Sequence, residues 1–110
     1  MKYFKTDDLQ WCKKISDHEF DFIEVREHRD DKYIYVTGNI DINDYSTEDA
    51  IKGYYENIEK VKEDYGNEWT QIVAECIFEQ TYDVELNCFG PFESKDTAEK
   101  AVEKYIKTIE

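Results

Sequence analysis

Proline and glycine are scarce in this chain, which has one proline and four glycines in 110 residues. Such a composition excludes a proline-rich or glycine-rich linker between two domains. The length is that of one small domain with a core of its own. We therefore expect residues 1–110 to fold as a single domain.

Cysteines and long apolar runs are also few. The three cysteines, Cys12, Cys76 and Cys88, are odd in number and lack a short paired spacing, which argues against a secreted disulfide framework. The first eight residues turn acidic before any apolar run develops, and no run approaches the length needed to cross a membrane. The sequence thus predicts a cytoplasmic protein without a membrane partner.

Basic residues are outnumbered: 14 lysines and arginines face 27 aspartates and glutamates, for a formal net charge of -13. A chain without a basic stripe would be repelled by phosphates, so direct nucleic-acid binding is disfavoured. High charge alone would suggest disorder, but 40% hydrophobic and 15% aromatic residues indicate a folded chain.

Hydrophobic periodicity predicts the main elements. Residues 20–27 and 32–37 alternate like two strands around a polar turn at 29–31, and Gly38 closes the second strand. Ser46 precedes a helical pattern that runs to residue 65, and Ser94 precedes another in the last sixteen residues. A short helix capped by Thr6 or Asp7 is expected before the first hairpin.

The densest apolar stretch, residues 68–89, predicts a second hairpin. Two sets of residues follow a period of two: Ile72, Ala74, Cys76 and Phe78, then Tyr82, Val84, Leu86 and Cys88. Both cysteines in these sets should lie in the core. The sequence therefore predicts an α+β fold, in which an antiparallel sheet of about four strands carries two main helices on one face. The order is (α)ββα-ββα, with a candidate internal ββα repeat.

Motifs for catalysis and for cofactors or metals are lacking. No signature joins His18 or His28 to a cysteine, so both histidines are interpreted as structural. Residues 39–43 resemble the start of a calcium loop, but Asp44 and Ala50 stand where glycine and glutamate are required. We therefore expect no enzyme activity, no catalytic residue, no metal and no cofactor.

Charge distribution carries the functional prediction. Residues 47–93 hold 12 acidic and 3 basic residues. In the predicted second hairpin, the phase opposite to the core is acidic, and two tyrosines of the first hairpin would lie near it. The predicted partner-binding residues are Glu75, Glu79, Asp83, Glu85, Tyr33 and Tyr35. Like charges on neighbouring strands cost stability, so a binding role is a reason to keep them; the alternative is that acidity only maintains solubility.

This surface suits the basic part of a larger protein. The leading hypothesis is a non-enzymatic inhibitor that occupies a nucleic-acid-handling site, by analogy of size and charge with DNA-mimicking phage proteins that block restriction or CRISPR nucleases. Immunity proteins that neutralise toxin nucleases are an alternative of the same kind. Two alternatives of other kinds remain: a module that forms a homodimer through an open sheet face, and a small-molecule binder with a pocket between sheet and helices.

Overall fold

The computed structural model describes residues 2–110, which form an α+β fold around one five-stranded antiparallel sheet. The strands follow one another in the order β1-β2-β3-β4-β5. Their bounds are Phe4–Asp7, Gln10–Lys14, Glu19–Glu27, Tyr33–Asp41 and Asn87–Phe92. The helices are α1 (Thr47–Ala50), α2 (Ile58–Tyr65), α3 (Trp69–Gln80) and α4 (Lys95–Ile109). Within residues 2–110, no helix combines the length and apolar character that a membrane crossing requires.

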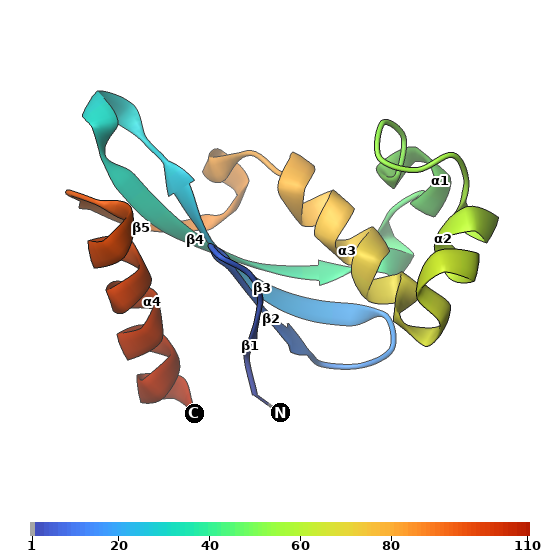
Figure 1. Cartoon of the computed structure of the whole chain (residues 1–110), viewed down its shortest axis with the longest axis horizontal. Coiled ribbons are helices and arrows are strands. Elements are labelled where there is room, and N and C mark those ends of the chain that lie inside the picture. Colours follow the sequence, from blue (N-terminus) through green and yellow to red (C-terminus); the bar gives the residue numbers. More distant parts are fainter. Residues whose placement is uncertain (1) are drawn as a thin grey trace.

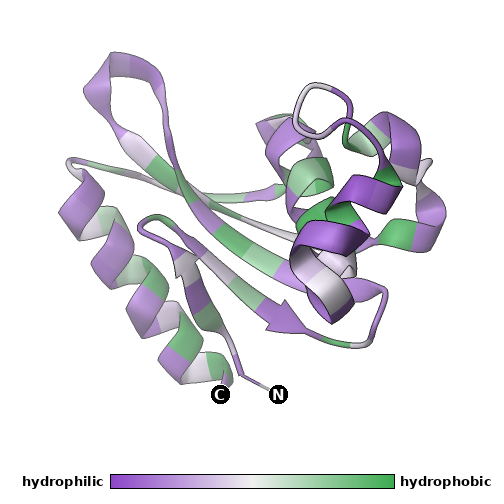
Figure 2. Cartoon of the chain, turned by 45° about the vertical axis from the view of Figure 1, so that its right-hand side comes forward, coloured by the Kyte–Doolittle hydropathy of each residue, from purple (hydrophilic) through white to green (hydrophobic). Residues whose placement is uncertain are grey.

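The first hairpin and the last helix are confirmed. β3 and β4 pair from Glu19↔Asp41 to Glu27↔Tyr33, and Figure 2 shows that the tip joining them is hydrophilic. Ser94 caps α4 through a hydrogen bond from the N–H of Thr97 to its side chain (3.2 Å). The prediction that β4 ends at Gly38 is wrong, because the strand continues to Asp41.

The sheet is covered on both faces, so the prediction of two main helices on one face is wrong. Figure 1 shows α4 on one side of the sheet and α1, α2 and α3 on the other. Phe22 of β3 and Phe78 of α3 stack at 5.0 Å in the larger core. On the opposite face, Val102 of α4 is buried with Trp11 and Ile23 of the strands. Side chains alternate along each strand, which lets one sheet supply both cores.

The second predicted hairpin is replaced by helix α3, a 3₁₀ turn at Asp83–Glu85 and the single strand β5. Residues buried on α3 include Val73, Cys76 and Ile77, which follow helical spacing, and only Cys76 of these three belongs to the predicted period of two. Cys76 is buried as predicted, but Cys88 is exposed because it lies on the edge strand β5. With only one strand in the second half, the internal ββα repeat is not confirmed.

Two further predictions, for the segment after Thr6 and for the segment after Ser46, are wrong. The short helix expected after Thr6 is instead the hairpin β1–β2, in which Lys5 pairs with Trp11. The long helix expected from Ser46 to residue 65 is divided into α1 and α2. Gly53 lies between them with a φ of 89°, a conformation that favours glycine, and Asn57 caps α2 by accepting from the N–H of Lys60.

Candidate functional site

The six predicted partner-binding residues do not share one surface. Tyr35 is buried beneath α4, where it stacks on Phe89 at 4.7 Å, and Tyr33 lies on the same side of the sheet. Glu75 and Glu79 lie on α3, which covers the opposite face of the sheet. The predicted acidic strand face, with the two tyrosines beside it, is therefore wrong as a description of where these side chains lie.

Three of the four predicted carboxylates nevertheless line one hollow region, which we call the acidic cleft. It consists of two adjoining hollows, of about 870 and 360 Å³, that share Asp7, Leu9, Glu24 and Glu79. Its walls are the β1–β2 turn, β3, the second half of α3 and the 3₁₀ turn after α3. The carboxylates that line it are Asp7, Asp8, Glu24, Glu27, Glu75, Glu79 and Asp83. Glu85 lies outside it and lines a different cleft.

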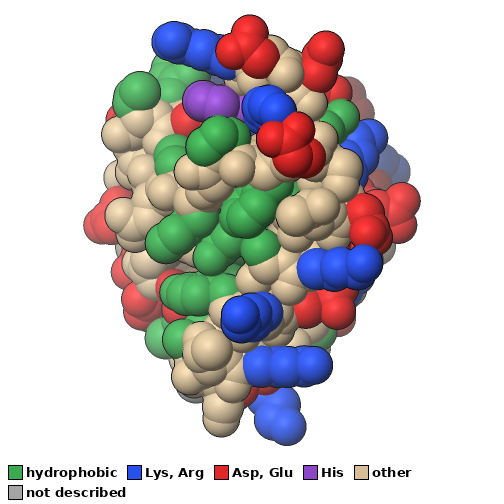
Figure 3. Space-filling model, turned by 90° about the vertical axis from the view of Figure 1, so that its left-hand side faces the viewer, with side chains coloured by type: hydrophobic (Ala, Val, Ile, Leu, Met, Phe, Trp, Pro, Cys, Tyr) green, Lys and Arg blue, Asp and Glu red, His purple; other side chains and the backbone are tan. Residues whose placement is uncertain are grey.

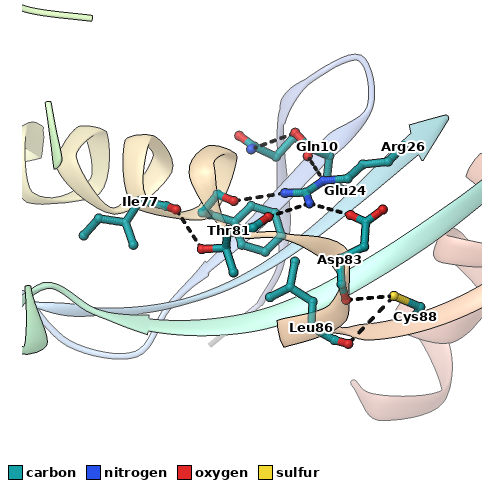
Figure 4. A network of polar contacts seen from close by, with 9 residues as sticks. Gln10, Glu24, Arg26, Ile77, Thr81, Asp83, Leu86 and Cys88 are labelled. Carbon is teal, nitrogen blue, oxygen red and sulfur yellow. Dashed lines mark hydrogen bonds and ion pairs between the residues drawn. The ribbon is translucent and has the colours of Figure 1, made fainter. Parts of the chain in front are cut away.

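Arg26 is the one basic residue among the described residues that line the acidic cleft. Its guanidinium donates hydrogen bonds to side chains and backbone carbonyls of the same chain (Figure 4). Its Nε donates to Glu24 Oε1 at 2.6 Å, and its Nη1 donates to Asp83 Oδ1 at 2.7 Å. The guanidinium also donates to two backbone carbonyls at 2.9 Å, those of Phe78 and Thr81. Arg26 therefore fastens β3 to the end of α3, and most of the negative charge of the cleft stays uncompensated.

Burial and the neighbouring carboxylates make ionisation of Glu24 unfavourable. Burial raises the pKa of its carboxyl to about 7, and neighbouring Glu79 contributes to the rise while the hydrogen bond from Arg26 opposes it. Burial also raises the pKa of Glu75, with further contributions from Asp7 and Glu79. Carboxylates from three separate parts of the chain thus oppose one another's ionisation.

The raised pKa of Glu24 predicts that stability falls as pH rises. Between its ordinary value near 4.3 and about 7, the folded state retains a proton that the unfolded state releases, so ionisation works against folding. After allowance for solvent screening, we expect a loss of about 1 to 2 kcal/mol between pH 5 and pH 8. Urea unfolding at several pH values measures it. The variant Glu24→Gln should lose less over this range, and an equal loss in both proteins would contradict the assignment.

The cysteine thiols are poorly placed to act as nucleophiles. Burial raises the pKa of Cys12 to about 12 and that of Cys76 to about 11, so neither is a thiolate at neutral pH. Cys88 is exposed, but its Sγ donates to the carbonyl of Asp83 at 3.2 Å and its pKa is also raised by burial. Within residues 2–110, no group of three acidic, cysteine or histidine side chains has the geometry to hold a metal ion.

The side of the molecule that carries α4 and β5 is different in character. α4 with its cap, residues 94–110, has four acidic and four basic residues. Figure 3 shows hydrophobic side chains across the middle of this side, with both basic and acidic side chains around them. The exposed apolar residues of β5 and the preceding turn include Phe89 and Val84. The excess negative charge of residues 47–93 is thus concentrated on the other side of the sheet.

No protein family, no curated protein and no solved structure matches this chain. The acidic cleft must therefore be interpreted from its own geometry. Sequence reasoning missed five of its charged members, which are Asp7, Asp8, Glu24, Arg26 and Glu27. One signal was available, because Glu24 and Arg26 share the strand phase of buried Phe22 and must face whatever packs on it.

Proposed function

We propose that this chain is a non-enzymatic inhibitor that docks its acidic cleft onto a basic surface of a larger protein, one that normally handles nucleic acid. The observation that carries the proposal is the set of seven carboxylates that line the acidic cleft. Its one basic residue among the described residues, Arg26, is already hydrogen-bonded to Glu24 and Asp83. Apart from the contacts of Arg26, this crowding of carboxylates works against folding, since burial and neighbouring charge oppose the ionisation of Glu24 and Glu75. A cationic partner would relieve that repulsion on binding.

The mechanism is electrostatic. The net charge of -13 steers the chain toward a positively charged groove, and the cleft then pairs its carboxylates with lysine and arginine side chains that would otherwise bind phosphates. Nucleic acid and the inhibitor would compete for one surface. Restriction and CRISPR nucleases, as targets of phage-encoded inhibitors, and toxin nucleases, as targets of immunity proteins, are the partner classes that fit this description.

A matched pair of variants tests the proposal. The cleft variant combines Asp7→Asn, Asp8→Asn, Glu75→Gln and Glu79→Gln. The control removes the same amount of charge elsewhere through Glu56→Gln, Glu59→Gln, Glu63→Gln and Glu103→Gln, all at exposed positions. Against a panel of purified restriction, CRISPR and toxin nucleases, the wild type should inhibit DNA cleavage by at least one. The cleft variant should lose about 100-fold in affinity, or about 0.7 kcal/mol per charge, while the control loses less than tenfold.

Salt provides a second measure. Raising the salt concentration from about 50 to about 200 mM should weaken the wild-type complex strongly and the complex of the cleft variant much less. The proposal fails if no nuclease of the panel is inhibited, or if the control variant is impaired as much as the cleft variant. In the second case, net charge rather than the acidic cleft would govern binding.

Self-association is a second candidate function, favoured by one observation. The edge strand β5 has no charged residue from Asn87 to Phe92 and exposes Phe89. Both faces of the sheet carry helices, which does not favour the open-face dimer expected from the sequence. A mass that rises with protein concentration in light scattering, without any inhibitory activity, would favour this candidate.

A further inference from the structure

One edge of β4 is only partly covered. β3 pairs with β4 along its whole length, as far as Asp41↔Glu19. β5 pairs with the other edge only as far as Thr37↔Asn87. Residues 38–41 of β4 therefore have a neighbouring strand on one side only. A strand edge of this kind presents unpaired backbone groups to which another chain can be added.

The hydrogen-bond pattern shows which backbone groups face the open side. His28 donates its N–H to the carbonyl of Lys32 at 2.8 Å, and Ile42 donates to the carbonyl of His18 at 2.9 Å. In an antiparallel ladder the direction alternates with each residue, so even-numbered residues of β4 bond to β3. The backbone groups of Asn39 and Asp41 consequently point toward the open side.

A cleft of about 590 Å³ lies along this edge, and we call it the edge cleft. Thr37 to Ile40 of β4 line it, together with α1 and the residues just before it, the end of α3 and the 3₁₀ turn that follows α3. That turn diverts the chain away from the line of β5 before residue 87, which leaves the edge open. Gln80 bridges the two helical walls by donating to the carbonyl of Ala50 at 2.6 Å.

The lining of the edge cleft is suited to a cation. It contains the carboxylates Asp49 and Glu85, and no lysine or arginine is found among its described lining residues. Tyr45 and Tyr82 also line it, with 47% and 76% of their surfaces exposed. Exposed tyrosine rings attract lysine and arginine side chains through their faces, in addition to the attraction of the carboxylates.

We propose that the edge cleft binds an extended peptide segment of a partner protein, which carries a lysine or arginine and adds to β4 as a strand along Asn39 and Asp41. Backbone hydrogen bonds supply the register, and Asp49, Glu85 and the tyrosines select the basic side chain. The edge cleft adjoins the acidic cleft, with which it shares Gln80, Thr81 and Tyr82, but its proposed role does not depend on the inhibitory function. A segment of about three residues spans the open edge, at about 3.4 Å per residue.

Selection from a random heptapeptide display library on the whole chain, followed by anisotropy with the labelled synthetic peptides, tests the proposal. Selected peptides should contain lysine or arginine. The variant Asn39→Pro removes the outward N–H and should weaken binding about tenfold or more, whereas Asn39→Ala keeps that N–H and should stay within about threefold. If Asn39→Pro fails to fold, two variants at exposed positions replace it in the test. Glu85→Lys and Tyr82→Ala should each weaken binding about tenfold or more.

Amide hydrogen exchange distinguishes strand addition from other modes of binding. The N–H of Asn39 should exchange rapidly in the free protein and become protected when the peptide binds. The proposal is overturned if no peptide is selected, if the selected peptides lack basic residues, or if bound peptide leaves Asn39 unprotected. Protection that grows with protein concentration alone would identify a second copy of this chain as the occupant and would likewise overturn it. If the selected peptides bind Glu85→Lys with the same affinity as the wild type, the role assigned to the carboxylates would be contradicted.

Discussion

Replacing Arg26 by alanine is expected to destabilise the protein by about 3 to 5 kcal/mol, the range for breaking a buried ion pair by removing one partner. Only 16% of the Arg26 side chain is exposed, and its loss leaves the Glu24 carboxylate, with 13% exposed, without its cation. The carbonyls of Phe78 and Thr81 also lose their donors. Urea unfolding measures the change. The loss should be larger at pH 8 than at pH 5, because Glu24 is then ionised.

Two variants define the control for this prediction. Arg29→Ala removes the same charge from an exposed turn and should change stability by less than about 0.5 kcal/mol. Arg26→Lys should recover only part of the loss, because an ammonium group cannot match the fork of contacts that the guanidinium makes. Equal effects of Arg26→Ala and Arg29→Ala would show that Arg26 does not fasten β3 to α3.

Elements whose signals are local could be predicted from the sequence. The β3–β4 hairpin combines strict alternation with a polar turn, and α4 combines an N-cap at Ser94 with an apolar stripe that includes Ala98 and Val102. Both signals lie within a few residues of the element that they specify. Neither segment fits both a strand pattern and a helix pattern.

The segment of α3 carried two patterns at once. Ile72, Ala74 and Phe78 fit a period of two, while Trp69, Val73 and Ile77 fit a helix, because apolar residues are dense in this stretch. The β-branched residues favoured a strand. Packing decided the outcome, since a helix at this place covers Phe22 and Val36 of the sheet with one continuous face.

The candidate site depends on contacts that a local pattern cannot contain. Glu75 and Glu79 lie one turn apart on α3, so they share a face, although for a different reason from the one predicted. Asp7 and Glu24 join them through the β1–β2 turn and β3, elements distant in the sequence. Tyr35 was expected at the surface, but α4 packs on the face that was predicted to be open and buries it.

At Gly38, local strand preference and tertiary contacts also predict different results. A substitution there is the second change for which we expect a large effect on stability. Valine is a better strand residue than glycine, so strand preference alone predicts that Gly38→Val stabilises β4. The structure predicts the opposite. A Cβ at this position would lie 2.7 Å from Leu86 Cδ2 and 3.0 Å from Phe78 Cε1, and Phe78 is held in place by its stack on Phe22. We expect Gly38→Val to cost about 2 to 3 kcal/mol.

A double-mutant cycle separates this steric cause from a general disturbance of the strand. Leu86→Ala removes the atom nearest to the new side chain, so Gly38→Val should cost at least about 1 kcal/mol less in that background. Thr37→Val keeps a β-branched side chain on the opposite face of the same strand, and it should change stability by less than about 0.5 kcal/mol. Additive effects of Gly38→Val and Leu86→Ala in urea unfolding would contradict the contact. Coupling between them would show that the close approach of Leu86 to β4, which also forms one wall of the edge cleft, requires glycine at position 38.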